Sequence, residues 1–182
     1  MATSLRPATI EDRRRIFEWL AKSDATAQMM GPPDYPDFPV PDFDEFLEDY
    51  NDDAFSDSGD FRIFVIRSDG VDIGAISYWI NGQVAEIDLW IGDRKNWGLG
   101  HGPRAMESIA GKLAELGKID ALIIRPSARN TRAISAYRKA GFLPYDHGSG
   151  NLPSWCSEEG FDYEDAVVLT RRLKGRTSSG AS

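Results

Sequence analysis

The middle of the chain holds three consecutive strand-like segments, joined by turns too short for anything but hairpins. They cover residues 61–67, 71–80 and 83–91, separated by Ser68-Asp69-Gly70 and by Asn81-Gly82. An Asn-Gly pair between two such segments favours a type I′ turn, which needs positive φ at both central positions. The sequence therefore predicts an antiparallel meander at the centre of the fold, with Asn81 and Gly82 as the turn residues.

Helices and further strands are predicted on both sides of this meander. Thr9 with Asp12, and Asp42 with Glu45, have the spacing of a capping box at the start of a helix. The other predicted elements are strands at 4–8, 119–124, 142–145 and 165–173, a proline-rich loop at 30–41, and helices at 9–22, 42–50, 103–116 and 130–139. This order predicts one domain over residues 1–173 and a small polar tail at 174–182 that we expect to be disordered.

The overall composition is that of an ordinary globular protein, with 41% hydrophobic and 27% charged residues in 182. The net charge of −8 argues against nucleic-acid binding, and no apolar run approaches the roughly 20 residues of a membrane span. The N-terminus lacks the basic start and apolar run of a secretory signal. The one cysteine, Cys156, and the two histidines, His101 and His147, have no metal-ligand spacing. We therefore predict a cytoplasmic protein without nucleic acid, membrane or metal.

The acidic residues are concentrated in one segment. Between Ser23 and Phe61 there is no Lys or Arg. The acids of this segment are Asp24, Asp34, Asp37, Asp42, Asp44, Glu45, Glu48, Asp49, Asp52, Asp53, Asp57 and Asp60. They form either the solvated faces of helices or a wall that attracts a cationic substrate, and the sequence leaves both interpretations open.

A glycine-rich loop, Gly98-Leu99-Gly100-His101-Gly102, lies between the last strand of the meander and the next predicted helix. Glycines let the backbone approach an anion closely, and a helix N-terminus offers unpaired N–H groups and the positive end of the helix dipole. The spacing is neither the dinucleotide fingerprint nor a Walker P-loop. By itself the loop is either an anion-binding site or a tight turn without a ligand.

A second motif lies about thirty residues further on, from Asn130 to Phe142. It resembles the signature Asn-x-x-Ala-x-x-x-Tyr-x-Lys-x-Gly-Phe of the GNAT N-acetyltransferases, and the region around it is most similar to aminoglycoside 6′-N-acetyltransferases and ribosomal-protein acetyltransferases. The glycine loop resembles the family's first motif, Arg/Gln-x-x-Gly-x-Gly/Ala, although Trp97 stands where that motif has Arg or Gln. The resemblance implies a GNAT fold, α/β (α+β), with a central mixed, mostly antiparallel sheet of six to seven strands flanked by about four helices.

The resemblance also implies acetyl-CoA as cofactor and names the residues that would hold it. The glycine loop would bind the pyrophosphate, and the backbone near Leu89 would lie beside the thioester and the pantetheine arm. Asn130 would contact that arm, or it would only cap its helix. The implied cofactor-binding residues are Leu89, Trp90, Ile91, Trp97, Gly98, Leu99, Gly100, His101, Gly102, Asn130, Ala133 and Tyr137. Many members are dimers, so a homodimer is compatible with the resemblance.

Two carboxylates of the third meander strand are candidates for the catalytic base. Strand alternation places Glu86 and Asp88 on one face, roughly 7 Å apart. In resembling enzymes the base lies on this strand, so we predict Asp88 as the base and Glu86 as a substrate anchor or alternative base. Tyr137 matches the family's tyrosine that protonates the leaving thiolate. The competing interpretation is that the carboxylates face solvent and Tyr137 only packs in the core.

These features predict an acetyltransferase that acts directly on a primary amine, with a cationic small molecule such as an aminoglycoside or a polyamine as acceptor. Three alternatives stay open. The acceptor is a protein N-terminus or a siderophore hydroxylamine, or the chain is a CoA-binding module without catalysis, or it is a nucleotide-binding regulatory domain.

Overall fold

The computed structural model describes residues 2–29, 40–56, 59–145 and 165–173. Several sequence predictions lie outside these ranges: most of the proline-rich loop, the acidic residues Asp34, Asp37 and Asp57, the side chains of His147 and Cys156, and the tail at 174–182.

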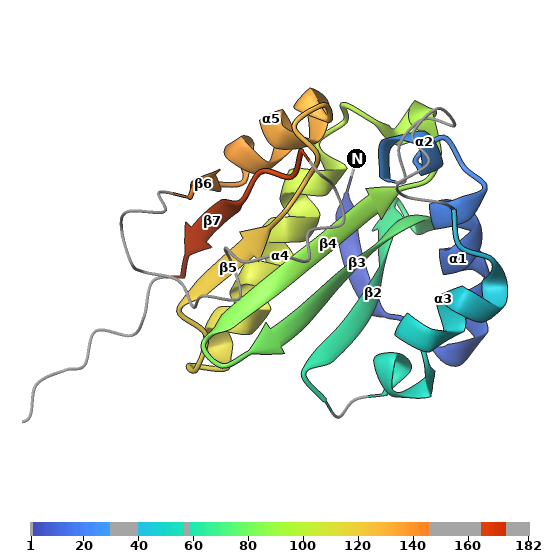
Figure 1. The fold of residues 1–182 in the computed structure, drawn as a ribbon, viewed down its shortest axis with the longest axis horizontal. Helices are drawn as coiled ribbons and strands as arrows, with labels where there is room; N and C mark the ends of the chain where they lie inside the picture. The colour runs from blue at the N-terminus through green and yellow to red at the C-terminus, as the bar shows by residue number, and fades with distance from the viewer. Residues whose placement is uncertain (1, 30–39, 57–58, 146–164, 174–182) are drawn as a thin grey trace, which may run out of the picture.

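A seven-stranded mixed sheet forms the centre of the molecule (Figure 1). Its strands are β1 (Thr3–Pro7), β2 (Phe61–Ser68), β3 (Val71–Asn81), β4 (Val84–Ile91), β5 (Ala121–Ile124), β6 (Leu143–Pro144) and β7 (Leu169–Arg172), in the order β1-β2-β3-β4-β5-β7-β6. All neighbouring pairs are antiparallel except β4 and β5, which are parallel. The predicted meander is β2-β3-β4, and the predicted mixed, mostly antiparallel sheet is confirmed.

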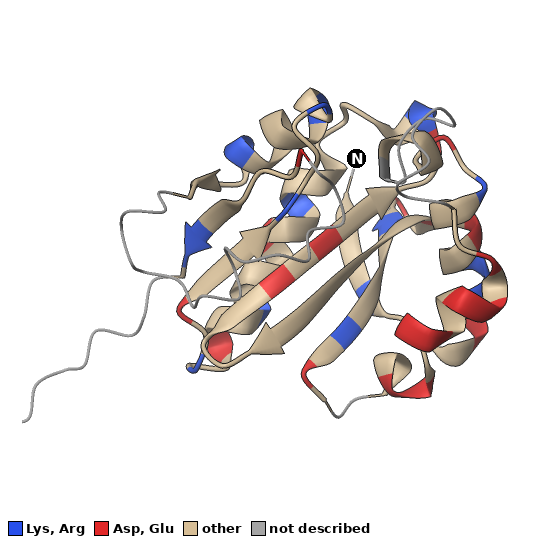
Figure 2. Ribbon diagram, viewed as in Figure 1, with Lys and Arg blue, Asp and Glu red and all other residues tan. Residues whose placement is uncertain are grey.

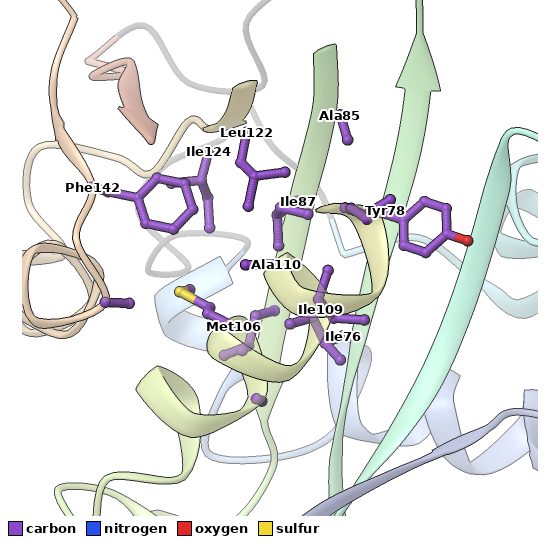
Figure 3. Packing of buried hydrophobic residues seen from close by; sticks show 14 of the residues in the cluster. Ile76, Tyr78, Ala85, Ile87, Met106, Ile109, Ala110, Leu122, Ile124 and Phe142 are labelled. Atoms are coloured by element: carbon purple, nitrogen blue, oxygen red, sulfur yellow. The ribbon is translucent and has the colours of Figure 1, made fainter. Parts of the chain in front are cut away.

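Helices cover both faces of this sheet. The helices are α1 (Arg13–Ala21), α2 (Thr26–Met29), α3 (Phe43–Asp49), α4 (His101–Glu115) and α5 (Thr131–Lys139), with 3-10 turns at Ile10–Asp12, Asp52–Phe55 and Arg94–Asn96. One hydrophobic cluster joins α4 and α5 to the sheet through Ile76, Ile87 and Ile109 (Figure 3). A second cluster packs α1 and α3 on the opposite face, against Ala75 and Trp90. None of the described helices has both the length and the apolar character to cross a membrane.

Local geometry corrects the predicted element boundaries in three places. The hairpin between β3 and β4 turns at Gly82-Gln83, because Asn81 pairs with Val84; only Gly82 has positive φ, at 63°, as a type II′ turn requires. The turn with two positive φ values is Asp69-Gly70 instead. Helix α4 begins at residue 101 rather than 103, because Gly100 adopts a left-handed conformation and serves as its N-cap. The last two strands are shorter than predicted.

Strands β4 and β5 pair over only part of their length. Val84 to Glu86 lie opposite Ala121 to Ile123, and β5 ends at Ile124 while β4 continues to Ile91. Figure 1 shows the two strands diverging beyond this point. Within the described residues, the second half of β4 therefore has a ladder partner in β3 but none in β5. The gap leaves backbone N–H and C=O groups of β4 outside the β4–β5 ladder, next to the glycine loop.

The close approach of β3 and β4 gives the first prediction. A Cβ added to Gly74 would lie 2.2 Å from the Trp90 carbonyl oxygen, which is fixed backbone. We expect Gly74→Ala to lower the free energy of unfolding by at least about 2 kcal/mol, because the clash forces the two strands apart. Chemical denaturation measures this loss.

The matched control is Gly111→Ala in α4, where an added Cβ meets nothing within 4 Å. This substitution should stabilise the protein by up to about 1 kcal/mol, because alanine favours the helix. Equal unfolding free energies for the two variants would contradict the steric explanation.

Candidate active site

The glycine loop ends in the N-terminus of α4. Gly98 and Gly100 have φ of 75° and 82°, a conformation that side chains disfavour. The N–H groups of His101 and Gly102 belong to the first turn of α4, where the helix itself supplies no acceptors. Together with the positive end of the helix dipole, they form the anion-binding geometry that the sequence predicted.

Arg104 and Thr3 fix this loop to the sheet. Arg104 Nη2 donates to the Leu99 carbonyl oxygen at 2.7 Å, and Arg104 Nε donates to Thr3 Oγ1 at 2.8 Å. Thr3 Oγ1 also lies 2.8 Å from Nδ1 of His101, which is 1% exposed. The other ring nitrogen of His101, Nε2, is buried without a hydrogen-bond partner.

Trp97, the residue that departs from the family motif, holds the loop to the end of β4. Its indole Nε1 donates to the Ile91 carbonyl oxygen at 2.7 Å. The Arg132 guanidinium carbon lies 3.5 Å from the centroid of the Trp97 ring, and the Arg94 guanidinium carbon lies 5.5 Å from it. Trp97 therefore brings cationic side chains to the loop without being charged itself.

A cavity of about 300 Å³, the cofactor cavity, lies between this loop and α5. It is lined by the predicted cofactor residues Leu89, Trp90, Ile91, Trp97, Gly98, Gly100, His101, Gly102, Asn130, Ala133 and Tyr137. Leu99 is not among the lining residues, and it is 41% exposed. Asn130 also caps α5, since its Oδ1 accepts from the Ala133 N–H at 3.1 Å.

The sequence analysis missed a row of lining residues on α5. Arg132, Ser135, Ala136 and Lys139 all line the cofactor cavity. They follow one another at helical spacing on the face that also carries Asn130, so helical periodicity applied to α5 predicts them.

A larger cavity of about 820 Å³, the acceptor cavity, lies on the face of β4 that carries Glu86 and Asp88. Its described lining includes five carboxylates and one guanidinium: Asp49, Asp53, Asp60, Glu86, Asp88 and Arg125. Figure 2 shows acidic residues on β4 and in the helical region around α3. The acidic segment is therefore divided: part of it lines this cavity, whereas Asp44 and Glu48 lie on the exposed surface of α3.

The two predicted β4 carboxylates have different surroundings. Glu86 accepts two hydrogen bonds from Arg125, at 2.6 Å and 2.8 Å, and both side chains are about one-fifth exposed. Asp88 Oδ1 accepts from the Leu89 N–H at 2.8 Å. Leu89 belongs to the part of β4 that has no β5 partner, so Asp88 lies at the gap between the two strands.

Tyr137 connects the two cavities. It is buried in the cluster between α4, α5 and the sheet, yet it lines the cofactor cavity and the acceptor cavity, as do Gln28 and Asn130. Burial first, and the charge of Asp88 second, raise the pKa of Tyr137 well above its usual range, while Arg132 acts in the opposite direction. Its hydroxyl therefore keeps its proton at neutral and moderately alkaline pH.

The described residues contain no group of three or more His, Cys, Asp and Glu side chains placed to hold a metal ion. They do fit coenzyme A. The cofactor cavity combines a glycine loop, the free N–H groups of a helix N-terminus and an unpaired strand edge, which suit a phosphate group and an amide-containing arm.

Residues 3–143 match the family described as the acetyltransferase (GNAT) domain. This match spans well over half of the chain, which therefore belongs to the GNAT family of acyltransferases. The predicted family and fold class are confirmed. No curated protein matches the sequence.

Several solved structures have the same fold. The acetyltransferase AAC(6′)-Ib, solved with paromomycin and acetyl-CoA, has a TM-score of 0.72 and 21% identity, with 100% of each chain covered. Its complex with ribostamycin and coenzyme A has a TM-score of 0.73, also at 21% identity and full coverage of each chain. The spermidine N-acetyltransferase of Vibrio cholerae, solved with CoA and spermine, has a TM-score of 0.68 and 21% identity over 94% of this chain and 95% of that one.

The burial of His101 predicts a pH-dependent stability. Burial first, and the nearby Arg104 second, lower the pKa of His101 below its ordinary value of 6.5. Between the two pKa values the imidazole is protonated in the unfolded chain but neutral in the folded protein. The stability that His101 contributes above pH 6.5 is therefore lost as the pH falls below that value.

We expect the melting temperature of the wild type to fall more than that of His101→Asn when the pH is lowered from about 7 to about 5. Differential scanning calorimetry of both proteins measures this difference. Parallel curves over that range would show that His101 does not contribute.

Proposed function

We propose that this protein transfers the acetyl group of acetyl-CoA directly to a primary amine of a cationic small molecule. The observation that carries the proposal is the junction of two cavities at Tyr137, one with a glycine loop and one lined by carboxylates. Acetyl-CoA supplies the acetyl group as a thioester. The predicted cytoplasmic location and homodimer stay predictions.

Asp88 is the base in this proposal. An amine must lose a proton before it attacks a carbonyl group, and a carboxylate within reach can take that proton directly or through water. Arg125 engages both oxygens of Glu86, so the ion pair occupies that carboxylate and favours Asp88. Glu86 then contributes charge to the wall of the acceptor cavity.

Leu89 and Tyr137 act on the other side of the reaction. Asp88 Oδ1 accepts from the Leu89 N–H, which lies in the part of β4 that has no β5 partner. When the carboxylate turns to the amine, this N–H becomes a donor for the oxygen that gains negative charge during attack. Tyr137 holds a proton at its hydroxyl oxygen and donates it to the departing sulfur. Its raised pKa favours this role, because the phenol stays protonated over the working pH range.

The acceptor is cationic because carboxylates outnumber cations in the described lining of its cavity. Asp49, Asp53 and Asp60 line the same cavity as the β4 carboxylates, and such a concentration of one charge attracts the opposite charge from solution. Two of the similar structures, solved with an aminoglycoside or with spermine, support the same class of acceptor.

Removing the base should slow acetyl transfer without abolishing the binding of acetyl-CoA or of the amine. We expect Asp88→Asn to lower kcat by about 10²-fold or more, since a positioned general base contributes on that scale. Thiol release from acetyl-CoA with spermine or ribostamycin as acceptor measures kcat. The control is Glu48→Gln, which removes an exposed carboxylate outside both cavities.

Normal turnover in Asp88→Asn would overturn the base assignment. Tight CoA binding by the wild type without thiol release, whichever amine is offered, would identify a CoA-binding module instead. Faster release with a peptide N-terminus or with a hydroxylamine than with cationic amines would change the acceptor class.

Neutralising the acidic wall should weaken acceptor binding selectively. We expect the triple variant Asp49→Asn, Asp53→Asn, Asp60→Asn to raise KM for spermine about 10-fold at low salt, with the KM for acetyl-CoA unchanged. The effect should shrink at high salt because the attraction is screened.

The control removes the same number of charges away from the cavity, by Asp44→Asn, Glu48→Gln and Glu115→Gln. If both triple variants raise the KM for spermine equally, the net charge of the protein and not the cavity wall attracts the acceptor.

A further inference from the structure

Two cationic side chains, Arg132 and Lys139, line the cofactor cavity, and an aromatic ring holds the first of them. Elsewhere in the described residues, arginines such as Arg6, Arg13 and Arg171 form ion pairs with acids. Arg132 also lies in the cofactor cavity, but within the described part of the chain no carboxylate is in salt-bridge contact with it. It lies instead over the ring of Trp97, 3.5 Å from the centroid.

A guanidinium held by an aromatic ring keeps its charge and its donors available, unlike one held in an ion pair. A guanidinium stacked on an indole is oriented by dispersion and by the ring quadrupole, so its positive charge is not neutralised. Stacking uses the face of the guanidinium and leaves the N–H groups at its edge available for an anion. Partial burial first, and the charge of Arg94 second, lower the pKa of Arg132. An anion bound beside the guanidinium would stabilise its positive charge against both.

The position of Arg132 fits a phosphate ligand. Trp97 directly precedes the glycine loop, and its indole N–H is tied to Ile91, so the ring is fixed at the mouth of that loop. Arg132 reaches the ring from the first turn of α5, on the opposite wall of the cavity. An anion held by the N–H groups of α4 would thus have a cation facing it from α5.

We propose that Arg132 is a coenzyme A-binding residue that contacts the diphosphate from the side opposite the glycine loop, and that Trp97 is the positioning residue that holds it there. Trp97 thereby brings a positive charge to the first motif from α5, where the family motif has Arg or Gln in the loop itself. This inference rests on the proposed use of acetyl-CoA and assigns a role to a variable position of the second motif.

The test measures the Kd of CoA by isothermal titration calorimetry at low and at high salt. We expect Arg132→Ala to raise Kd about 10-fold or more at low salt, since a hydrogen-bonded charge contributes on that scale. The factor should shrink at high salt, because a contact between charges is screened. The matched control is Arg138→Ala, which removes an exposed arginine of the same helix outside the cavity.

Trp97 is tested through its coupling to Arg132. Trp97→Leu should raise Kd in the wild-type background and have little effect in the Arg132→Ala background, because it acts through Arg132. Trp97→Phe keeps a ring for stacking but loses the hydrogen bond to Ile91, so it should raise Kd less than Trp97→Leu does.

The inference is overturned if Arg132→Ala binds CoA as tightly as Arg138→Ala. It is also overturned if Arg132→Ala raises Kd by the same factor at both salt concentrations. If the effects of Trp97→Leu and Arg132→Ala on the binding free energy of CoA are additive, Trp97 does not act by positioning Arg132. If the wild type itself does not bind CoA, the proposed function fails with the inference, so the two failures are distinguishable.

Discussion

The incomplete pairing of β4 and β5 is the constraint on which the candidate site depends. The two strands share a ladder only over Val84 to Glu86, and β4 continues alone toward the glycine loop. This gap leaves the Leu89 N–H outside the ladder, where it donates to Asp88, and it lets Tyr137, anchored in the core on one face, line the acceptor cavity on the other. A β5 that paired along all of β4 would close the gap and separate the two cavities.

Two features keep this gap in position. On one side β4 is held firmly to β3, where Gly74 permits a backbone approach that no larger residue allows. On the other side Trp97 donates to Ile91 at the end of β4, and Arg104 ties the loop to β1. The glycine loop and the strand that carries Asp88 are therefore fixed to one another.

Charge is distributed differently in the two cavities. The charged side chains in the described lining of the acceptor cavity are five carboxylates and Arg125, which Glu86 already engages. The cofactor cavity contains Arg132, held by an aromatic ring and not by an acid. An anionic cofactor and a cationic acceptor would each meet the opposite charge, which favours both orientation and discrimination between the two.

The sequence by itself determined the elements and the family. The meander, the Asn130 cap and the glycine loop could be read from residue patterns because each depends on local backbone geometry, although the turn at Gly82 and the start of α4 differed by a residue or two. Strand alternation alone also placed Glu86 and Asp88 on one face. Only the tertiary structure decided that Arg125 engages Glu86, that part of the acidic segment lines a cavity, and that Arg132 stacks on Trp97. Arg125 and Glu86 are 39 positions apart in the sequence, and Arg132 and Trp97 are 35 positions apart. No local pattern encodes which side chains the packing of β4, β5 and α5 brings together.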